Sequence, residues 1–277
     1  MIITITGGTG FLGRELTKEL INHPFVNEVR IISRNEFKQA EMRAELKNDK
    51  IKFFLADIRL QDDLKPAFRG SETVIHAAAC KRIDSCEDNV FYSTDVNING
   101  TMNVLKECDN SGVKNLVFIS SDKASRPHTT YGSQKYLCEQ LVRRCHYSFR
   151  KTVVRYGNVI GSTGSIFPIW EKQHKEGVPI TITNPDMTRF FWTAKEAVLF
   201  VLNNIQDNGK EVNIPRIESM KIGELANYLY PNDEKKIIGI TKNEKMNEEL
   251  HPDISSENYV VSPTDHKGLQ EWIKEQK

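Results

Sequence analysis

The chain has 277 residues, a formal net charge of +1 and a hydrophobic share of 39%. That length suits one large domain or two closely joined ones, and this apolar content is enough for a sizeable core. The near-zero charge disfavours nucleic-acid binding, because no basic excess is available to displace counterions from phosphates. No apolar run approaches the ~20 residues that cross a bilayer, so no membrane partner is expected.

The opening residues, MIITITGG, lack the basic region, apolar stretch and cleavage site of a secretory signal, so we expect a cytoplasmic protein. The cysteines are odd in number and form no CxxC pair. We therefore expect reduced thiols that fill space, with no disulfide framework and no metal site. They are Cys80, Cys86, Cys108, Cys138 and Cys145.

Short apolar runs alternate with helical patterns through the first half of the chain. Strands are predicted over residues 2–6, 28–33, 51–56, 73–77, 116–119 and 152–155. Helices are predicted over residues 11–21, 36–46, 96–111 and 131–147. This repetition is typical of an α/β fold in which helices cover both faces of a Rossmann-type, doubly wound parallel sheet.

Glycines and prolines interrupt the pattern from about residue 157 onward. Helices are predicted over 194–204 and 221–229, and from residue 266 to the end. We predict a Rossmann domain over 1–157, which parts of 190–217 rejoin. Residues 158–277 then form a smaller substrate-binding lobe that caps the open end of the sheet.

The first strand is followed directly by a glycine-rich turn that opens a helix. Gly7 permits a tight turn, Gly10 lets the backbone approach a pyrophosphate, and Gly13 lets the helix pack closely on the sheet. The helix N-terminus offers free N–H groups and a positive dipole to that anion. The cofactor contacts predicted in this turn are Gly7, Thr9, Gly10, Phe11, Leu12 and Gly13.

The end of the second strand favours NADP over NAD. An acidic residue at this point would bind a free 2′-hydroxyl, whereas the chain has Ser33 and Arg34, with Lys38 one helical turn further on. A hydroxyl and two cations suit a 2′-phosphate. Glu36 lies close to them and weakens this interpretation.

Two later strand ends are also assigned to the cofactor. Asp57 and Ile58 follow the third strand, where an adenine ring would lie. The small residues Ala77, Ala78 and Ala79 follow the fourth strand and leave room for ribose and pyrophosphate. Asn97 either buttresses this end of the sheet or caps a helix, and the sequence leaves both roles open.

A YxxxK pattern places Tyr131 and Lys135 on the same face of a helix. A free tyrosine has a pKa of ~10, too high for a base at neutral pH. A neighbouring ammonium and an oxidised nicotinamide both favour the phenolate, which could then deprotonate a sugar hydroxyl. Upstream lies Ser121-Asp122-Lys123, an acid beside an amine at the carboxyl end of a central strand, where ligands bind in such sheets.

With these residues in place, the chain resembles the inverting UDP-N-acetylglucosamine 4,6-dehydratases, a family of extended short-chain dehydrogenases/reductases. The resemblance spans roughly residues 1–240 and is carried by ordered segments, namely GGTGFLG, SRNEFKQAEMRAE, HAAACKRID, SSDKAS, YGSQK, RYGNVIGSTGS, PITITNPDMTRFF and IESMKIGELA. The SRNE segment looks like the NADP-binding turn of that family. Asp122-Lys123 looks like the inverting enzymes, whereas retaining dehydratases usually carry Asp-Glu there and 4-epimerases carry non-ionisable residues.

The resemblance implies a mechanism in which the oxidation is transient. Tyr131, aided by Ser121 and Lys135, removes the 4-hydroxyl proton while NADP takes the C4 hydride. Unprotonated Lys123 then takes the C5 proton, protonated Asp122 donates to the departing 6-hydroxyl, and hydride returns to C6. Reprotonation of C5 from the other face inverts that centre. Partial burial and the positive nicotinamide are expected to lower the pKa of Lys123.

Lys81, Asn158 and Arg189 are the residues that we expect to bind a UDP-sugar, with Arg189 clamping the diphosphate. The chain departs from the family pattern over residues 239–248, where the arginine, proline, second glycine and histidine of a GIRPGEK…HE segment are missing.

The helices from Val96 and from Tyr131 resemble those that pair across two-fold axes in related enzymes, so a homodimer or larger oligomer is expected. A retaining dehydratase, a 4-epimerase and a non-catalytic NADP-binding regulator remain alternatives.

Overall fold

The computed structural model describes residues 1–207 and 211–276. Residues 208–210, which fall in the segment predicted to rejoin the sheet, and residue 277 lie outside the described part. A seven-stranded sheet forms the base of the molecule, and all of its strand pairs are parallel. Its spatial order is β10 (Val212–Asn213), β6 (Arg150–Val154), β5 (Asn115–Ile119), β4 (Thr73–His76), β1 (Ile2–Thr6), β2 (Glu28–Ser33) and β3 (Ile51–Leu55).

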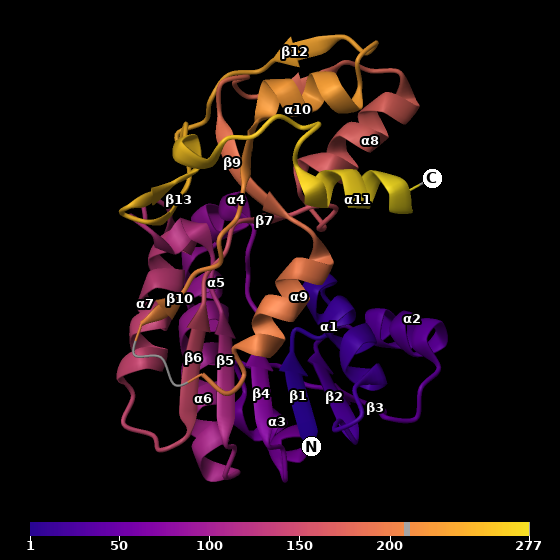
Figure 1. Ribbon diagram of the computed structural model, residues 1–277. Helices are drawn as coiled ribbons and strands as arrows, with labels where there is room; N and C mark the ends of the chain where they lie inside the picture. The colour runs from indigo at the N-terminus through magenta and orange to yellow at the C-terminus, as the bar shows by residue number, and fades with distance from the viewer. Residues whose placement is uncertain (208–210, 277) are drawn as a thin grey trace.

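Helices cover both faces of this sheet and bury a core on each (Figure 1). One face carries α1 (Phe11–Asn22), α2 (Glu36–Leu46) and α9 (Ala194–Asn203), and the other carries α3 (Gln61–Phe68), α6 (Gly100–Asn110) and α7 (Thr130–Arg144). Neighbours along a strand point to opposite faces, as Leu116 and Val117 do. The predicted Rossmann-type, doubly wound fold is therefore confirmed.

A smaller lobe lies over the carboxyl ends of the strands and has a core of its own, centred on Trp170 (Figure 1). Its elements are β7 (Asn158–Val159), α8 (Ile166–Glu176), β8 (Ile180–Ile182), β9 (Thr188–Trp192), β11 (Ser219–Lys221), α10 (Ile222–Leu229), β12 (Lys235–Ile237), β13 (Glu249–His251), β14 (Ile254–Ser255), η3 (Ser256–Tyr259) and α11 (Lys267–Glu275). Between β9 and β11 the chain returns to the large sheet as α9 and β10.

The structure corrects the predicted elements in two places. The helix expected over 96–111 begins earlier, because α5 (Val90–Thr94) and a π-helical turn, η1 (Asp95–Asn99), run into α6. Sequence analysis missed α3, α4 (Ile83–Asp88) and α8. Two of these helices are too short for a clear helical period, and both α3 and α8 carry a proline.

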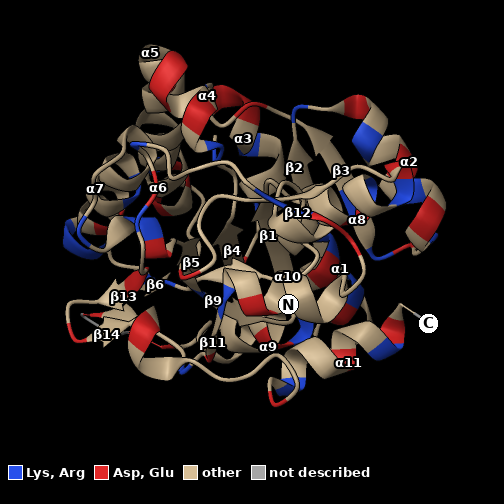
Figure 2. Cartoon of the chain, turned by 90° about the horizontal axis from the view of Figure 1, so that it is seen from above, with Lys and Arg blue, Asp and Glu red and all other residues tan. Residues whose placement is uncertain are grey.

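Seen from above, Lys and Arg positions are interspersed with Asp and Glu positions along the ribbon of the lobe and of the outer helices (Figure 2). Among the described residues, no helix combines the length and the apolar character that crossing a bilayer requires.

Candidate active site

The glycine turn after β1 lies directly against the loop that follows β4. Gly7 has φ +69°, and a Cβ there would come within 2.8 Å of the Ala78 backbone. A Cβ on Gly13 would lie 2.5 Å from Gly8, so α1 packs on the turn itself. Gly10 caps α1 with no side-chain acceptor, which leaves the first N–H groups of the helix free for an anion. The turn therefore fits a dinucleotide pyrophosphate.

Asn97 fixes the end of the alanine loop. It is 2% exposed and lies inside the continuous helical run, so capping a helix is not its role. Its Oδ1 accepts from Cys80 N at 2.8 Å, and its Nδ2 donates to Cys80 O at 3.0 Å and to Gln134 Oε1 at 2.7 Å. Of the two roles left open by the sequence, the buttress agrees with these contacts. Direct contact with a cofactor stays a prediction.

Cations and one aromatic ring gather beside the end of β2. Arg34 donates to Tyr92 Oη at 2.5 Å and lies 3.6 Å from an Asp57 oxygen. Arg59, which sequence analysis missed, holds Asp57 through bonds of 3.0 and 2.7 Å and stacks over the same ring. Burial alone would raise the pKa of Asp57, but Arg59 and Arg34 together lower it. Lys38 is exposed nearby.

The other predicted contacts of this region have protein partners. Ser33 Oγ accepts from Gln39 Nε2 at 3.1 Å. Ile58 is 5% exposed and packs against Gly100, where an added Cβ would lie 2.7 Å from its side chain. Ile58 therefore belongs to the core, and its contact with an adenine ring stays a prediction.

The acid and the amine meet in a short 3₁₀ turn after β5, η2 (Asp122–Ala124). Ser121 Oγ donates to Asp122 Oδ1 at 2.9 Å, and Lys123 Nζ lies 2.7 Å from Asp122 Oδ2. Asp122 is 3% exposed, and its backbone N–H donates to Tyr156 O at 3.0 Å. A solvated surface ion pair is therefore ruled out for Asp122 and Lys123.

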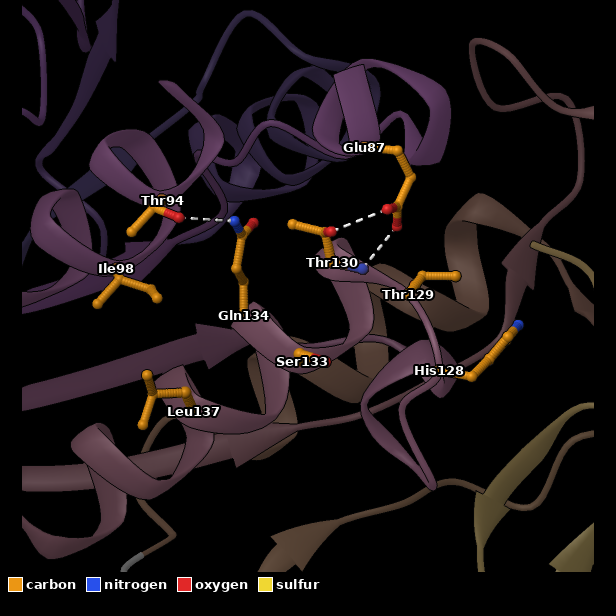
Figure 3. Close-up of a pocket in the computed structure, with 9 residues that line it drawn as sticks. All are labelled: Glu87, Thr94, Ile98, His128, Thr129, Thr130, Ser133, Gln134 and Leu137. Atoms are coloured by element: carbon orange, nitrogen blue, oxygen red, sulfur yellow. Dashed lines mark hydrogen bonds between the residues drawn. The ribbon is translucent and has the colours of Figure 1, made fainter. Parts of the chain in front are cut away.

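The helix α7 brings Tyr131 and Lys135 to this turn. Both side chains are buried, on the face of α7 turned toward the sheet. Gly132 makes the approach possible, because a Cβ there would overlap the carbonyl oxygen of Lys123. Around the rim of α7, Glu87 accepts from Thr130 N and Oγ1 at 2.6 and 2.9 Å, beside a pocket of about 520 Å³ (Figure 3).

The electrostatics of the YxxxK pair differ from the expectation. Burial, and then the charge of Asp122, raise the pKa of Tyr131 above its usual value. Burial lowers the pKa of Lys135 to about 8, and its Nζ donates to Ile119 O at 2.5 Å and lies 4.2 Å from the Phe118 ring centre. The protein contacts of Tyr131 therefore do not lower its pKa, and the effect expected from a neighbouring ammonium together with an oxidised nicotinamide stays a prediction.

The protein groups around Lys123 do not give the expected lowering of its pKa, and the share assigned to a positive nicotinamide stays a prediction. Burial does act in that direction, but the nearby carboxylates of Asp122 and Glu248 outweigh it, and the pKa is raised. Glu248 Oε1 lies 2.8 Å from Lys123 Nζ. In the sequence, Glu248 matches the glutamate that ends the GIRPGEK…HE pattern, within a segment that otherwise departs from it, and sequence analysis assigned it no role.

The predicted substrate residues lie at the junction of the sheet and the lobe. Lys81 Nζ donates to Thr163 O at 3.1 Å, and Asn158 opens β7 beside β9. Arg189 directs its guanidinium to the backbone of Thr188, Lys245 and Met246, at distances of 2.8 to 3.0 Å. Arg189 thus anchors the segment before β13, and its predicted diphosphate contact is untested.

Comparison with known proteins places this site in a family. Residues 3–267 match the model of the family described as "Polysaccharide biosynthesis protein". The chain belongs to that family. A UDP-N-acetylglucosamine 4,6-dehydratase (inverting) from Campylobacter jejuni is 39% identical over 95% of this chain and 83% of its own length, which confirms the resemblance seen in the motifs.

Two further relatives of this polysaccharide biosynthesis protein bear on its function. A UDP-glucose 4-epimerase from Rickettsia rickettsii is 35% identical over 92% of this chain and 78% of its own length. The X-ray structure of Pen from Bacillus thuringiensis superposes with a TM-score of 0.85 at 33% identity, covering 90% of this chain and 83% of that one.

Replacement of Gly132 by Ala tests how α7 is placed in this family member. The added methyl overlaps the Lys123 carbonyl, so α7 or η2 must shift, and overpacking of this kind costs about 1–3 kcal/mol of unfolding free energy. Urea denaturation measures the loss. Ser133→Ala, on the exposed side of the same turn, should stay within about 0.5 kcal/mol of the parent. Equal stability of the two variants would refute the close contact.

Proposed function

We propose that this chain is an inverting UDP-N-acetylglucosamine 4,6-dehydratase, which releases water from C5 and C6 of the sugar and inverts C5. The observation that carries the proposal is the buried Asp122–Lys123 pair, held at 2.7 Å beside the YxxxK helix. An elimination needs both an acid for the leaving hydroxyl and a base for the neighbouring C–H proton. The names of the Campylobacter jejuni relatives support it.

The main alternative is a 4-epimerase, because a relative of that name is 35% identical to this chain. An epimerase exchanges hydride at C4 alone and needs neither an elimination acid nor a C5 base. A buried acid–amine pair would have no task in that reaction. A retaining dehydratase also eliminates water, so only the configuration of the product at C5 separates it from the proposal.

In the proposed reaction, Tyr131 removes the 4-hydroxyl proton, with Ser121 and Lys135 as its supporting groups. A dinucleotide bound at the β1 turn would accept hydride from C4 and return it to C6. The resulting 4-ketone acidifies the C5 proton, which Lys123 takes up. Asp122 gives its proton to the 6-hydroxyl, which departs as water. Burial of the acid and the amine keeps bulk water away from both groups, so their protons are not lost to solvent during the reaction.

For the cofactor we propose NADP. Arg34 and Arg59 flank the Tyr92 ring at the end of β2, and Lys38 is exposed beside them. Guanidinium groups suit a 2′-phosphate through paired hydrogen bonds. Asp57 also lies in this cluster, but its charge is already matched by Arg59. Because net redox is zero over the cycle, the dinucleotide stays bound between turnovers.

We propose that the protein acts as a homodimer that pairs through α5, α6 and α7. Apolar side chains are exposed on these three helices, most of all Phe91 at 94%, with Tyr136 and Leu137 near 45%. The pocket of Figure 3 opens beside Leu137 on the same surface. Exposed apolar residues clustered in this way are typical of an interface.

Incubation with UDP-N-acetylglucosamine in D₂O, without added cofactor, tests the reaction. We expect mass spectrometry to show loss of water and NMR to show deuterium at an inverted C5, because Lys123 exchanges the C5 proton with solvent. Lys123→Ala should bind the dinucleotide normally and lose at least ~10²-fold in turnover. An unchanged mass with inverted C4 would instead identify an epimerase, and retained C5 a retaining dehydratase.

Arg34→Ala tests the cofactor preference. Removal of a cation that faces the 2′-phosphate should weaken NADPH binding by about tenfold or more and leave NADH binding nearly unchanged. Fluorescence titration of the nicotinamide measures both dissociation constants. Arg43→Ala serves as the matched control, because Arg43 lies at the other end of α2 over Phe53. Equal weakening for the two dinucleotides would count against NADP recognition by Arg34.

Leu137→Glu tests the dimer. A charge in the middle of an apolar interface carries a desolvation cost, so light scattering should show a shift from twice the 31.8 kDa chain mass toward the monomer. Leu199→Glu, at a similarly exposed leucine of α9, should leave the mass unchanged. A monomeric parent protein, or dissociation by Leu199→Glu alone, would contradict pairing through α7.

A further inference from the structure

Glu248 comes from the lobe and reaches the catalytic turn of the large domain. It is 2% exposed, and its Oε1 lies 2.8 Å from Lys123 Nζ. The same ammonium lies 2.7 Å from Asp122 Oδ2. Lys123 is therefore held between two carboxylates, one adjacent in the chain and one supplied by the residue just before β13.

The backbone of Glu248 is fixed by a buried hydroxyl network. Glu248 N donates to Ser256 Oγ at 2.8 Å, and Ser256 N donates to Glu248 O at 2.8 Å. Ser256 Oγ also contacts Thr188 Oγ1 at 2.6 Å, which ties the segment to β9. The carboxylate is thus delivered to Lys123 from a rigid support, so its position is set by the fold and not by a mobile loop.

The charge of Glu248 is concentrated on Lys123. Among the described residues, its Oε2 is buried and has no hydrogen-bond partner. Arg189 Nε lies 3.8 Å from Oε1, beyond hydrogen-bond distance, and the other Arg189 donors are directed to backbone carbonyls and to Met187 Sδ. A buried carboxylate that few other donors compensate acts strongly on the one ammonium that it contacts.

We propose that Glu248 is the positioning residue of the base: it fixes Lys123 Nζ and stabilises the ammonium that forms when Lys123 takes the C5 proton. This inference rests on the proposed dehydration. It gives Lys123 the kind of partner that a buried carboxylate provides to the general base of a catalytic triad. Asp122 cannot fill that role as well, because it must hold a proton for the leaving hydroxyl.

The proton inventory of the step agrees with this arrangement. One proton is first passed from Lys123 Nζ to Asp122 Oδ2 across their 2.7 Å contact, which makes the free amine and the acid together. The C5–H bond then breaks, its electron pair enters the enolate of the 4-ketone, and a new N–H bond forms at Nζ. The C6–O bond breaks as Asp122 protonates the oxygen. Lys123 is then again an ammonium between two carboxylates, as in the structure.

Glu248→Gln keeps the shape and one hydrogen-bond acceptor but removes the charge. We expect water release and C5 deuterium exchange to slow by ~10-fold or more, whereas C4 oxidation, read as absorbance at 340 nm in a single turnover, should be retained. The KM for UDP-N-acetylglucosamine should change little. The alkaline limb of the kcat profile should move to lower pH by about one unit, since the proton shared by Asp122 and Lys123 is held less tightly.

Other charged or titratable groups surround the contact between Lys123 and Glu248. They are Asp122 on η2, Arg189 on β9 and Tyr131 on α7. Glu248→Asp serves as the conservative variant, because it keeps the charge and should leave the alkaline limb near that of the parent. Glu249→Gln is the matched control on the next residue, where the partly buried carboxylate pairs with the exposed Arg126 instead of Lys123.

The inference would be overturned if the parent enzyme eliminates water and the Glu248→Gln variant has the same rate of C5 exchange and the same pH profile. That outcome would leave the proposed function intact. A parent enzyme that releases no water would refute the function itself. Loss of C4 oxidation together with elimination in a folded Glu248→Gln protein, as judged by thermal unfolding, would also overturn the inference, because it would assign Glu248 to the whole site.

Discussion

The buried ammonium of Lys123 connects the large domain with the smaller lobe. Lys123 lies at the end of β5 in the large domain, and Glu248 reaches it from the lobe across a 2.8 Å contact. A buried carboxylate without a counter-charge is strongly destabilising, so the lobe and the sheet are held together at the point where chemistry is proposed to occur. The geometry of the proposed active site consequently depends on both parts together, and neither part contains it alone.

Several neighbouring contacts reinforce this junction. Lys245 Nζ donates to the carbonyls of Ser125 and Arg126 at 3.2 and 2.9 Å, and thereby holds the loop that follows η2. Deeper in the structure, Arg155 pairs with Glu139 and also donates to Leu250 O at 2.7 Å. The segment that departs from the family pattern over residues 239–248 thus retains Lys245 and Glu248, whose side chains contact η2 and the residues directly after it.

The contacts at this junction also affect the two groups proposed to act as bases, because they make loss of a proton from each of them harder. Two carboxylates raise the pKa of Lys123, while burial raises that of Tyr131. In the proposed reaction, Lys123 and Tyr131 therefore both act against a raised pKa. A site of this kind couples its proton transfers, since the charge of each group depends on its neighbours.

The sequence by itself determined the parts of this protein that depend on local order. The β1 turn at Gly7 and Gly13, the alternation of strand and helix, and the placement of Tyr131 and Lys135 on one helical face all follow from spacing along the chain. Only the tertiary structure decided which distant groups meet. Glu248 reaches Lys123, Arg59 holds Asp57, and Gly132 admits the Lys123 carbonyl. Such contacts depend on where separate loops converge, and burial at that point sets the pKa values, so no short-range pattern encodes them.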